Sequence, residues 1–262
     1  MKVLLLGITG NVGSRLAPAL IAHGHSVVAY VRHASRSKIN PVLATQLTAV
    51  VEGEGTDAEA IKNAVLDHSC YAAVNCAGVA ALSSWNKPSE LPAIFAAVTK
   101  GIVDARRSRG KTSLPIRVWM LSGMCILDYP ANPKKLIVDL LPVYPEHRGN
   151  WELIKKVDPD DMKWSLLCAM EMPPKHEPAM TSAPDDCRGN MVAGSDTLVA
   201  FRKTWVSEVP LIGGFLSFVV QASDYMASVE DCVDWVAEDL EKGLESEYVG
   251  KRVCLKLKSK AT

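Results

Sequence analysis

The sequence carries no excess of either charge. Its 262 residues include 29 lysines and arginines and 29 aspartates and glutamates, so the formal net charge is zero. A balanced charge provides no attraction to the phosphates of nucleic acid or to an anionic membrane surface. The sequence therefore predicts neither nucleic acid nor a membrane as a partner.

Long apolar runs are also missing. No stretch reaches the roughly 20 apolar residues that a membrane-spanning helix needs, and the apolar stretch Met1–Leu6 is too short for a secretory signal. Leu211–Val220 is apolar but short, and its two glycines indicate a buried segment or the wall of a pocket.

The seven cysteines form no pairing pattern. Their number is odd, no two stand as Cys-x-x-Cys, and the ligand spacing of a zinc site is absent. Five of them lie in or beside apolar runs that resemble strands: Cys70, Cys76, Cys125, Cys168 and Cys254. This usage is typical of reduced, buried cysteines. We therefore expect a cytoplasmic protein with no disulfide and no metal.

A glycine-rich turn near the start of the chain is the strongest positive signal. The apolar stretch Lys2–Gly7 predicts a strand buried on both faces, and Ser14–His23 has apolar residues at helical spacing. A strand joined to a helix by such a turn directs free N–H groups and the positive end of the helix dipole at an anion. The candidate ligands of a pyrophosphate are Gly7, Thr9, Gly10, Asn11, Val12 and Gly13.

The context of this turn favours a dinucleotide over a tight turn without a ligand. A second strand, His25–Val31, follows the first helix, as the dinucleotide-binding motif requires. Further strands are predicted at Thr48–Val51, Tyr71–Cys76, Ile116–Leu121 and Lys163–Cys168. Helices are predicted at Ala58–Leu66 (opened by a capping box from Thr56 to Glu59), Pro88–Arg109 and Glu146–Lys156. This alternation indicates an α/β, Rossmann-type doubly wound parallel sheet.

We expect a single domain over residues 1–262 with three parts. Residues 1–170 would form the dinucleotide-binding core. Residues 171–225 would form a small irregular substrate lobe, because prolines interrupt the pattern there repeatedly. Residues 226–262 would close the fold with a helix from Ser228 to near Gly243 and a strand at Tyr248–Leu257.

The residue after the second strand indicates which cofactor is bound. An acid there binds the ribose 2′-hydroxyl of NAD, whereas an arginine accommodates the 2′-phosphate of NADP. Arg32 stands at this place, with Ser35 and Arg36 close behind and no acid nearby in the sequence. We therefore expect NADP(H); the alternative is a solvated basic loop.

Three other strand ends should meet the cofactor, because ligands of open sheets lie beyond the carboxyl ends of the strands. Glu54 and Gly55, with Gly53 before them, should border the adenine. The small residues of Cys76-Ala77-Gly78 should pass under the ribose, and Ser122 should face the nicotinamide.

Together these segments resemble the atypical short-chain dehydrogenase/reductase superfamily, nearest its NmrA-like and NAD(P)H-binding branches. The resemblance rests on five segments: Gly7–Gly13 as GxTGxxG, Tyr30-Val-Arg32, Val74–Gly78, Trp164–Leu167 and Val229-Glu-Asp231. It covers nearly the whole chain, and it implies a Rossmann fold and a nicotinamide cofactor.

The resemblance also implies a catalytic set that this chain keeps only in part. Members use a serine with Tyr-x-x-x-Lys, and Ser122 matches the serine. No Tyr-x-x-x-Lys exists here; the nearest segment is Tyr144-Pro-Glu-His-Arg148. Tyr144 and His147 are therefore the candidate proton donors. The alternative is that Tyr144 only packs and His147 only touches the cofactor.

The substrate side is altered as well. Where members have Arg-Pro after the sixth strand, this chain has Ala169-Met170, so Met170 should border the nicotinamide. Glu171 is a proton donor only if it is buried. Asp128 and Tyr129 either line the substrate side or form an ordinary turn.

We therefore expect an NADP(H)-dependent oxidoreductase that transfers hydride to or from a carbonyl, imine or activated alkene, in secondary metabolism. The substrate would be bulky and apolar, given a lobe that contains Met170, Met172, Trp205, Phe215 and Phe218, although plain core residues would give the same composition. Two alternatives stay open: a non-catalytic NADPH-sensing regulator, and a non-redox cyclase or isomerase. The helix Pro88–Arg109 offers a face for a homodimer.

Overall fold

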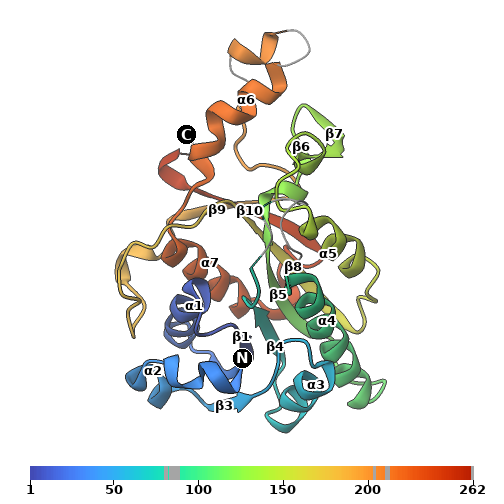
Figure 1. Cartoon of the computed structure of the whole chain (residues 1–262), viewed down its shortest axis with the longest axis vertical. Helices are drawn as coiled ribbons and strands as arrows, with labels where there is room; N and C mark the ends of the chain where they lie inside the picture. Colours follow the sequence, from blue (N-terminus) through green and yellow to red (C-terminus); the bar gives the residue numbers. More distant parts are fainter. Residues whose placement is uncertain (80–81, 83–88, 203–204, 210–212, 261–262) are drawn as a thin grey trace.

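A central sheet organises the computed structural model (Figure 1), which describes residues 1–79, 82, 89–202, 205–209 and 213–260. Its strands are β1 Lys2–Leu6, β2 Ser26–Val31, β3 Ala49–Glu52, β4 Ala72–Asn75, β5 Ile116–Gly123, β8 Met162–Ala169, β9 Met191–Ser195 and β10 Lys251–Leu257. They lie in the order β3-β2-β1-β4-β5-β8-β10-β9. All neighbours are parallel except β9, which runs antiparallel to β10. The predicted doubly wound parallel sheet is confirmed.

The strand order reverses beside β1. The chain leaves β1 for β2 and β3 on one side and returns to β4 on the other. The connections on the two sides therefore run in opposite directions and leave a crevice at the carboxyl ends of β1 and β4. In open α/β sheets, ligands bind at such a point.

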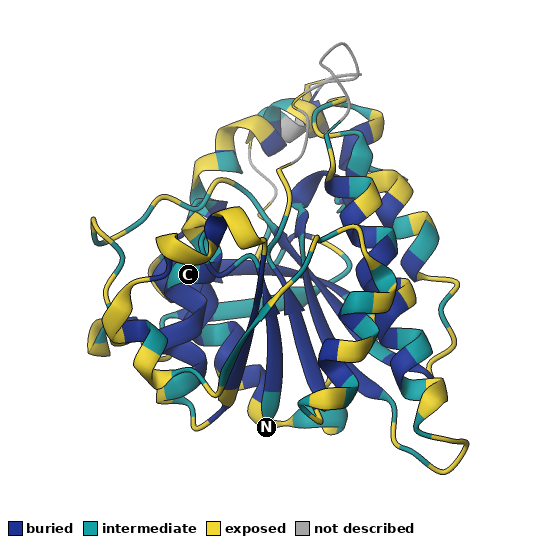
Figure 2. Cartoon of the chain, turned by 60° about the horizontal axis from the view of Figure 1, so that its bottom comes forward, coloured by how far each residue is buried: buried dark blue, intermediate teal, exposed yellow. Residues whose placement is uncertain are grey.

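Helices cover both faces of the sheet, which accounts for the continuous apolar runs of the central strands. The described α-helices are α1 Asn11–Ala22, α2 Pro41–Gln46, α3 Ala58–Asp67, α4 Leu91–Ser108, α5 Glu146–Ile154, α6 Gly213–Gln221 and α7 Val229–Glu241. Helices α1 and α7 pack together on one face, whereas α3, α4 and α5 cover the other. Figure 2 shows the buried strands between these two helical layers.

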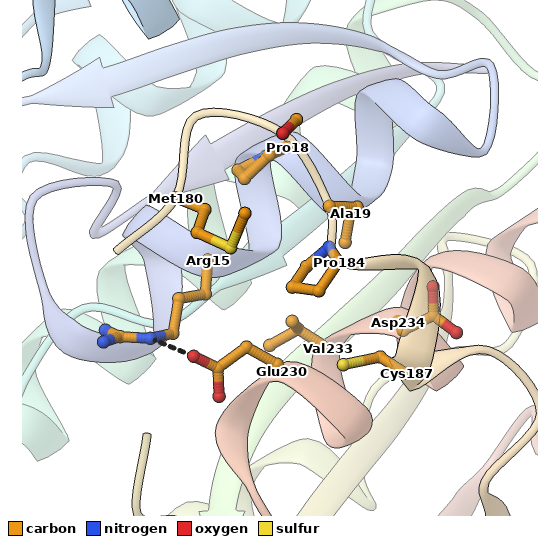
Figure 3. A pocket seen from close by; sticks show the side chains of 11 residues that line it. Arg15, Pro18, Ala19, Met180, Pro184, Cys187, Glu230, Val233 and Asp234 are labelled. Carbon is orange, nitrogen blue, oxygen red and sulfur yellow. Dashed lines mark hydrogen bonds and ion pairs between the residues drawn. The ribbon is translucent and has the colours of Figure 1, made fainter. Parts of the chain in front are cut away.

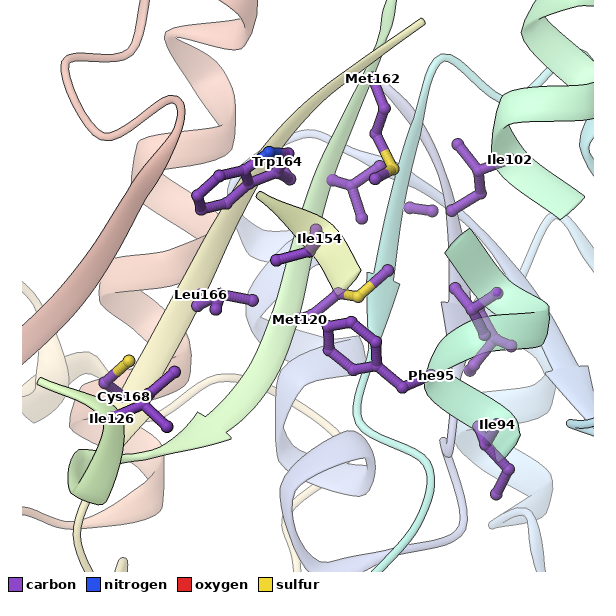
Figure 4. Close-up of a cluster of buried hydrophobic side chains, with 14 of the residues drawn as sticks. Ile94, Phe95, Ile102, Met120, Ile126, Ile154, Met162, Trp164, Leu166 and Cys168 are labelled. Atoms are coloured by element: carbon purple, nitrogen blue, oxygen red, sulfur yellow. The ribbon is translucent and has the colours of Figure 1, made fainter. Parts of the chain in front are cut away.

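The larger core fills the face under α3, α4 and α5. Phe95 and Ile102 of α4 are fully buried there, together with Ile154 of α5 (Figure 4). They pack against side chains of β5 and β8 such as Met120 and Leu166. This core packs α5 against β5 and β8, which matters for the site below.

Two helix starts and one helix cap differ from the sequence prediction. Helix α1 begins at Asn11, because the last residues of the glycine turn are already helical. Helix α3 is capped by Asp57, not Thr56: the Asp57 carboxylate accepts hydrogen bonds from the backbone N–H groups of Glu59 and Ala60, both at 3.0 Å. Helix α4 begins at Leu91, and Pro88 lies outside the described residues.

The region 171–225 contributes to the main sheet as well as to its surroundings. Strand β9 pairs with β10 at the sheet edge, so this part of the region belongs to the core of the fold. Helix α6 and the hairpin of β6 Asp128–Tyr129 and β7 Asn132–Leu136 lie at the top of Figure 1, opposite the N terminus.

The closing segment matches its predicted form. Helix α7 begins after Ser228, whose hydroxyl accepts a hydrogen bond from the backbone N–H of Asp231 at 3.1 Å. All seven cysteines are free, and six of them are buried. Among the described residues, no helix is both long and apolar enough to span a bilayer.

Candidate functional site

The glycine turn is fitted tightly between β1, β4 and α1. Gly7 has a φ of +89°, and a Cβ atom there would lie 2.7 Å from the backbone nitrogen of Ala77. A Cβ atom on Gly13 would lie 2.1 Å from the Gly7 carbonyl oxygen. Neither position tolerates a side chain. The backbone of the turn is therefore pressed against β4 and α1, as a dinucleotide-binding turn requires.

The N terminus of α1 is available to an anion. Gly10 is its N-cap residue, and no side chain caps the helix. Gly10 and Asn11 are exposed, and Thr9 and Val12 are half-buried. A 12-residue helix with an uncapped N terminus presents backbone N–H groups and a positive dipole end, which suits a pyrophosphate.

A buried arginine lies directly below this turn. The Arg15 guanidinium donates to the Asn11 side-chain oxygen at 2.6 Å and to the Glu230 carboxylate of α7 at 2.8 Å. It also donates to the backbone carbonyl of His176 at 2.6 Å. Figure 3 shows Arg15 and Glu230 facing each other beside the segment that carries Met180. The bond to Asn11 fixes the orientation of its side-chain amide beside the glycine turn.

The loop after β2 contains the residues predicted to bind the 2′-phosphate, and they differ in exposure and in the partners of their side chains. Arg32 is exposed and precedes the 3₁₀ helix η1 His33–Lys38. Within the described residues, its guanidinium has no hydrogen-bond or ion-pair partner. Ser35 is buried, so little of its surface can meet a cofactor. Arg36 is exposed but already forms an ion pair with Glu52.

Glu52 corrects the expectation that no acid lies near Arg32. It is the last residue of β3 and pairs in register with Val31, the last residue of β2. Its carboxylate accepts hydrogen bonds from His33 and Arg36, which lower the pKa of Glu52. Sequence distance concealed this acid, because only the β2–β3 pairing brings it to the loop.

The loop after β3 is shaped by a tyrosine of β2. The Tyr30 hydroxyl donates to the Glu54 backbone carbonyl at 3.0 Å. A Cβ atom on Gly53 would lie 2.2 Å from that hydroxyl oxygen, so a side chain there would displace the Tyr30 ring. Glu54 itself is exposed and Gly55 is half-buried, next to Ile94. This loop is accessible at the predicted adenine border.

The end of β4 forms a narrow turn beside the glycine turn. Asn75 is buried, and its side-chain oxygen accepts a hydrogen bond from the Ala77 N–H at 3.0 Å. Burial raises the pKa of the Cys76 thiol to about 12, so this thiol stays protonated. Gly78 has a φ of +98°, which favours glycine. The small residues predicted to pass under the ribose thus adjoin β1.

Ser122 and His147 form a buried pair at the end of β5. The Ser122 hydroxyl lies 3.3 Å from His147 Nδ1, and both residues are less than 9% exposed. Desolvation lowers the pKa of His147 to about 4, so the imidazole is neutral at pH 7. A neutral ring has one donor and one acceptor nitrogen, which allows it to pass a proton.

Gly123 makes this approach possible, a role that the sequence analysis did not assign to it. A Cβ atom on Gly123 would lie 2.8 Å from His147 Cδ2. The glycine therefore lets the ring lie flat against β5. The signal was visible only as Ser122-Gly123 at the end of a strand, which is too common to interpret.

Tyr144 and Arg148 are placed differently from a tyrosine–lysine pair. Tyr144 precedes α5 with a left-handed φ of +51°, and its ring centroid lies 6.4 Å from that of His147. The Arg148 guanidinium forms an ion pair with Asp139. Among the described residues, Arg148 makes no hydrogen bond to Tyr144. Of the two candidate proton donors, only His147 contacts Ser122.

The predicted substrate-side residues do not gather in one place. Met170 and Met172 are half-buried and pack against the core, and Phe218 is buried. Trp205 is 84% exposed and Phe215 is 36% exposed. Glu171, the conditional proton donor, is exposed.

Asp128 has a structural partner that the sequence analysis missed. Arg252 of β10 pairs with Asp128 at 2.9 Å and with Asp196 at 3.2 Å, and it donates to the Ile126 carbonyl at 2.7 Å. Its guanidinium also lies 4.7 Å from the ring centroid of Trp151. Arg252 therefore fastens the segment after β5 to the sheet edge. The part of the chain that the structure describes contains no cluster of three metal-binding side chains.

Comparison with known proteins agrees with this geometry. Residues 3–147 match the NAD dependent epimerase/dehydratase family. None of the curated proteins compared with the chain is similar to it in sequence. The match to the NAD dependent epimerase/dehydratase family spans more than half of the chain, so the chain belongs to this family.

Solved structures share the fold over nearly their full length. A Burkholderia pseudomallei protein is 20% identical with a TM-score of 0.64, covering 98% of this chain and 99% of that one. A short-chain dehydrogenase/reductase from Veillonella parvula, solved in complex with NADP, is 13% identical with a TM-score of 0.62, covering 100% and 96%. An oxidoreductase from Lactococcus lactis is 15% identical with a TM-score of 0.59, covering 98% and 91%. At these identities the likeness shows a shared fold, and the family match over residues 3–147 is what supports the resemblance to the short-chain dehydrogenase/reductase superfamily.

Proposed function

We propose that this protein is an NADP(H)-dependent oxidoreductase that transfers hydride between the nicotinamide and a carbonyl, imine or activated alkene of a bulky apolar molecule. The observation that carries the proposal is the buried contact between Ser122 and His147, 3.3 Å apart. It stands at the carboxyl end of β5, separated from the β1 glycine turn only by β4. A cofactor bound to that turn would extend across β4 toward this pair.

The cofactor would supply the hydride, and the chain would orient it and move a proton. With the imidazole proton on Nδ1, His147 donates to Ser122, and the Ser122 hydroxyl can donate to a substrate oxygen. As charge develops on that oxygen, Ser122 gives up its proton and receives the one from His147. In the same step the second ring nitrogen would take a proton from water, so that the imidazole stays neutral and no imidazolate forms. Tyr144 would line the entrance to the proposed substrate site rather than act as the proton donor.

Arg32 supports the choice of NADP(H). It follows β2 directly, it is exposed, and no other described side chain engages it. A free guanidinium can bind a phosphate through two hydrogen bonds. The NADP complex of the similar Veillonella parvula enzyme is consistent with this choice.

The experiment is a turnover assay with NADPH and a panel of apolar aldehydes, ketones, imines and enones, followed by the loss of NADPH absorbance. We expect turnover of at least one class. Ser122→Ala should reduce it by about 100-fold, because one positioned proton relay contributes about that much. Unchanged turnover in Ser122→Ala would contradict the proposed roles.

Two other functions predict different results in the same assay. A regulator that senses NADPH would bind the cofactor and consume none. The ion pair of Arg148 with Asp139 favours this alternative, because it leaves no tyrosine–cation pair at α5. A cyclase, isomerase or epimerase would form product without net loss of NADPH, and the family match supports that class.

We also propose that the protein acts in the cytoplasm, in secondary metabolism, as a homodimer. Seven free cysteines, six of them buried, support a reducing compartment. Helix α4, packed against α3 and α5, is the proposed dimer element. The oligomeric state follows from light scattering of the purified chain, and a monomer would contradict this part.

A further inference from the structure

We propose that Glu52 sets how strongly this site prefers NADP(H) over NAD(H), by competing with the 2′-phosphate for Arg36 and His33. The inference rests on the proposed cofactor site and adds a residue that limits its selectivity. Glu52 would be a specificity-determining residue that acts through the cations it binds.

The position of Glu52 follows from the register of the sheet. Val31 and Glu52 are paired across β2 and β3, so the β3 carboxylate lies beside the start of the loop Arg32–Lys38. In dinucleotide folds this loop faces the adenosine ribose. Glu52 is therefore close to the place where the 2′-phosphate would bind.

The cationic side chains of this loop differ in whether a carboxylate already binds them. The Glu52 carboxylate receives Arg36 Nη1 on one oxygen and His33 Nδ1 on the other. The His33 side chain is 90% exposed and that of Arg36 is 56% exposed, so both could turn toward a ligand. Arg32 has no partner within the described part of the chain. In the free protein, one arginine is thus ready for a phosphate and a second is held by a carboxylate.

The charges predict a selective effect on NADP(H). A 2′-phosphate is anionic, so the Glu52 charge repels it and also occupies Arg36, which a phosphate could otherwise bind bidentately. A ribose 2′-hydroxyl is uncharged, and neither effect applies to NAD(H). Removing the charge of Glu52 should therefore tighten the binding of NADPH and leave the binding of NADH nearly unchanged.

The experiment is calorimetric titration with NADPH and NADH of the wild-type chain, Glu52→Gln, Arg36→Ala and the double variant. We expect Glu52→Gln to tighten NADPH binding about fivefold, the size of one screened charge contact. The affinity for NADH should change less than twofold. Arg36→Ala should have little effect in the wild-type background and a clear one beside Glu52→Gln, since only there is Arg36 free. Glu59→Gln is the matched control, because Glu59 is an exposed carboxylate that also pairs with a cation, Lys62, but lies outside the proposed cofactor site.

The outcomes separate this inference from the function it rests on. If no nucleotide binds the wild-type chain, the proposed function fails. If NADPH binds but Glu52→Gln leaves its affinity unchanged, or Glu59→Gln tightens it equally, the inference alone is overturned. Weaker NADH binding by Glu52→Gln would also overturn it, because Glu52 would then bind the ribose hydroxyl. Thermal unfolding of each variant confirms that it is folded.

Discussion

At the scale of single residues, the site depends on the fit of His147 against β5. The ring reaches Ser122 only because Gly123 has no side chain. Gly123→Ala should push the ring away, destabilising the fold by about 1–3 kcal/mol and lowering turnover at least tenfold. Denaturant unfolding and the NADPH assay measure the two effects.

Gly149 provides the control for this substitution. It lies in the same helix as His147, and a Cβ atom there would have no neighbour within 4 Å. Gly149→Ala should stabilise the protein by about 0.5–1 kcal/mol, since alanine is the better helix former. Equal behaviour of the two variants would mean that the Gly123 contact is unimportant.

The buried imidazole of His147 predicts acid sensitivity. Burial lowers the pKa of His147 from 6.5 to about 4, so between these values the unfolded chain binds a proton that the folded chain does not. Stability from this group is therefore present above pH 6.5 and lost as the pH falls toward 4, by up to about 3 kcal/mol.

His147→Asn tests this dependence, because asparagine does not titrate. Urea unfolding at pH 7 and pH 4.5 should show a smaller loss of stability for the variant than for the wild-type chain. A loss of the same size in both proteins would assign the acid sensitivity to other groups.

At the scale of elements, a buried ion pair joins α1 to α7 beneath the glycine turn. Arg15 and Glu230 are 2.8 Å apart, with side chains 5% and 3% exposed. Glu230→Gln would leave the Arg15 charge without its buried partner, and we expect a loss of about 3 kcal/mol. Glu238→Gln, an exposed change in the same helix, should stay within about 0.5 kcal/mol. Chemical denaturation distinguishes them, and equal losses would contradict the role of the pair.

Local patterns predicted most elements, and they were wrong where two neighbouring residues competed. The strands β1, β2 and β4 were predicted to within a residue or two, because buried parallel strands are continuously apolar. The cap of α3 was assigned to Thr56 by its spacing to Glu59, whereas Asp57 makes the bonds. Thr56 and Asp57 are both good caps, and the pattern alone could not choose between them.

At the scale of the whole molecule, the sequence predicted the doubly wound parallel sheet but not the contacts between distant segments. The glycine turn and the alternation of strands and helices were enough for a doubly wound sheet. The antiparallel edge strand β9 was missed, because it is only five residues long and Gly194 interrupts its apolar pattern. Glu52 beside Arg36 and Ser122 beside His147 depend on register and packing, which no local pattern contains.

The central claim is that the β1 turn and Arg32 bind NADP(H), and calorimetric titration tests it most directly. We predict that the wild-type chain binds NADPH more tightly than NADH and that Arg32→Ala removes most of this difference. Loss of a paired phosphate contact should cost about 1.5–3 kcal/mol. If neither nucleotide binds, or if Arg32→Ala leaves the preference unchanged, the account of the cofactor site is wrong.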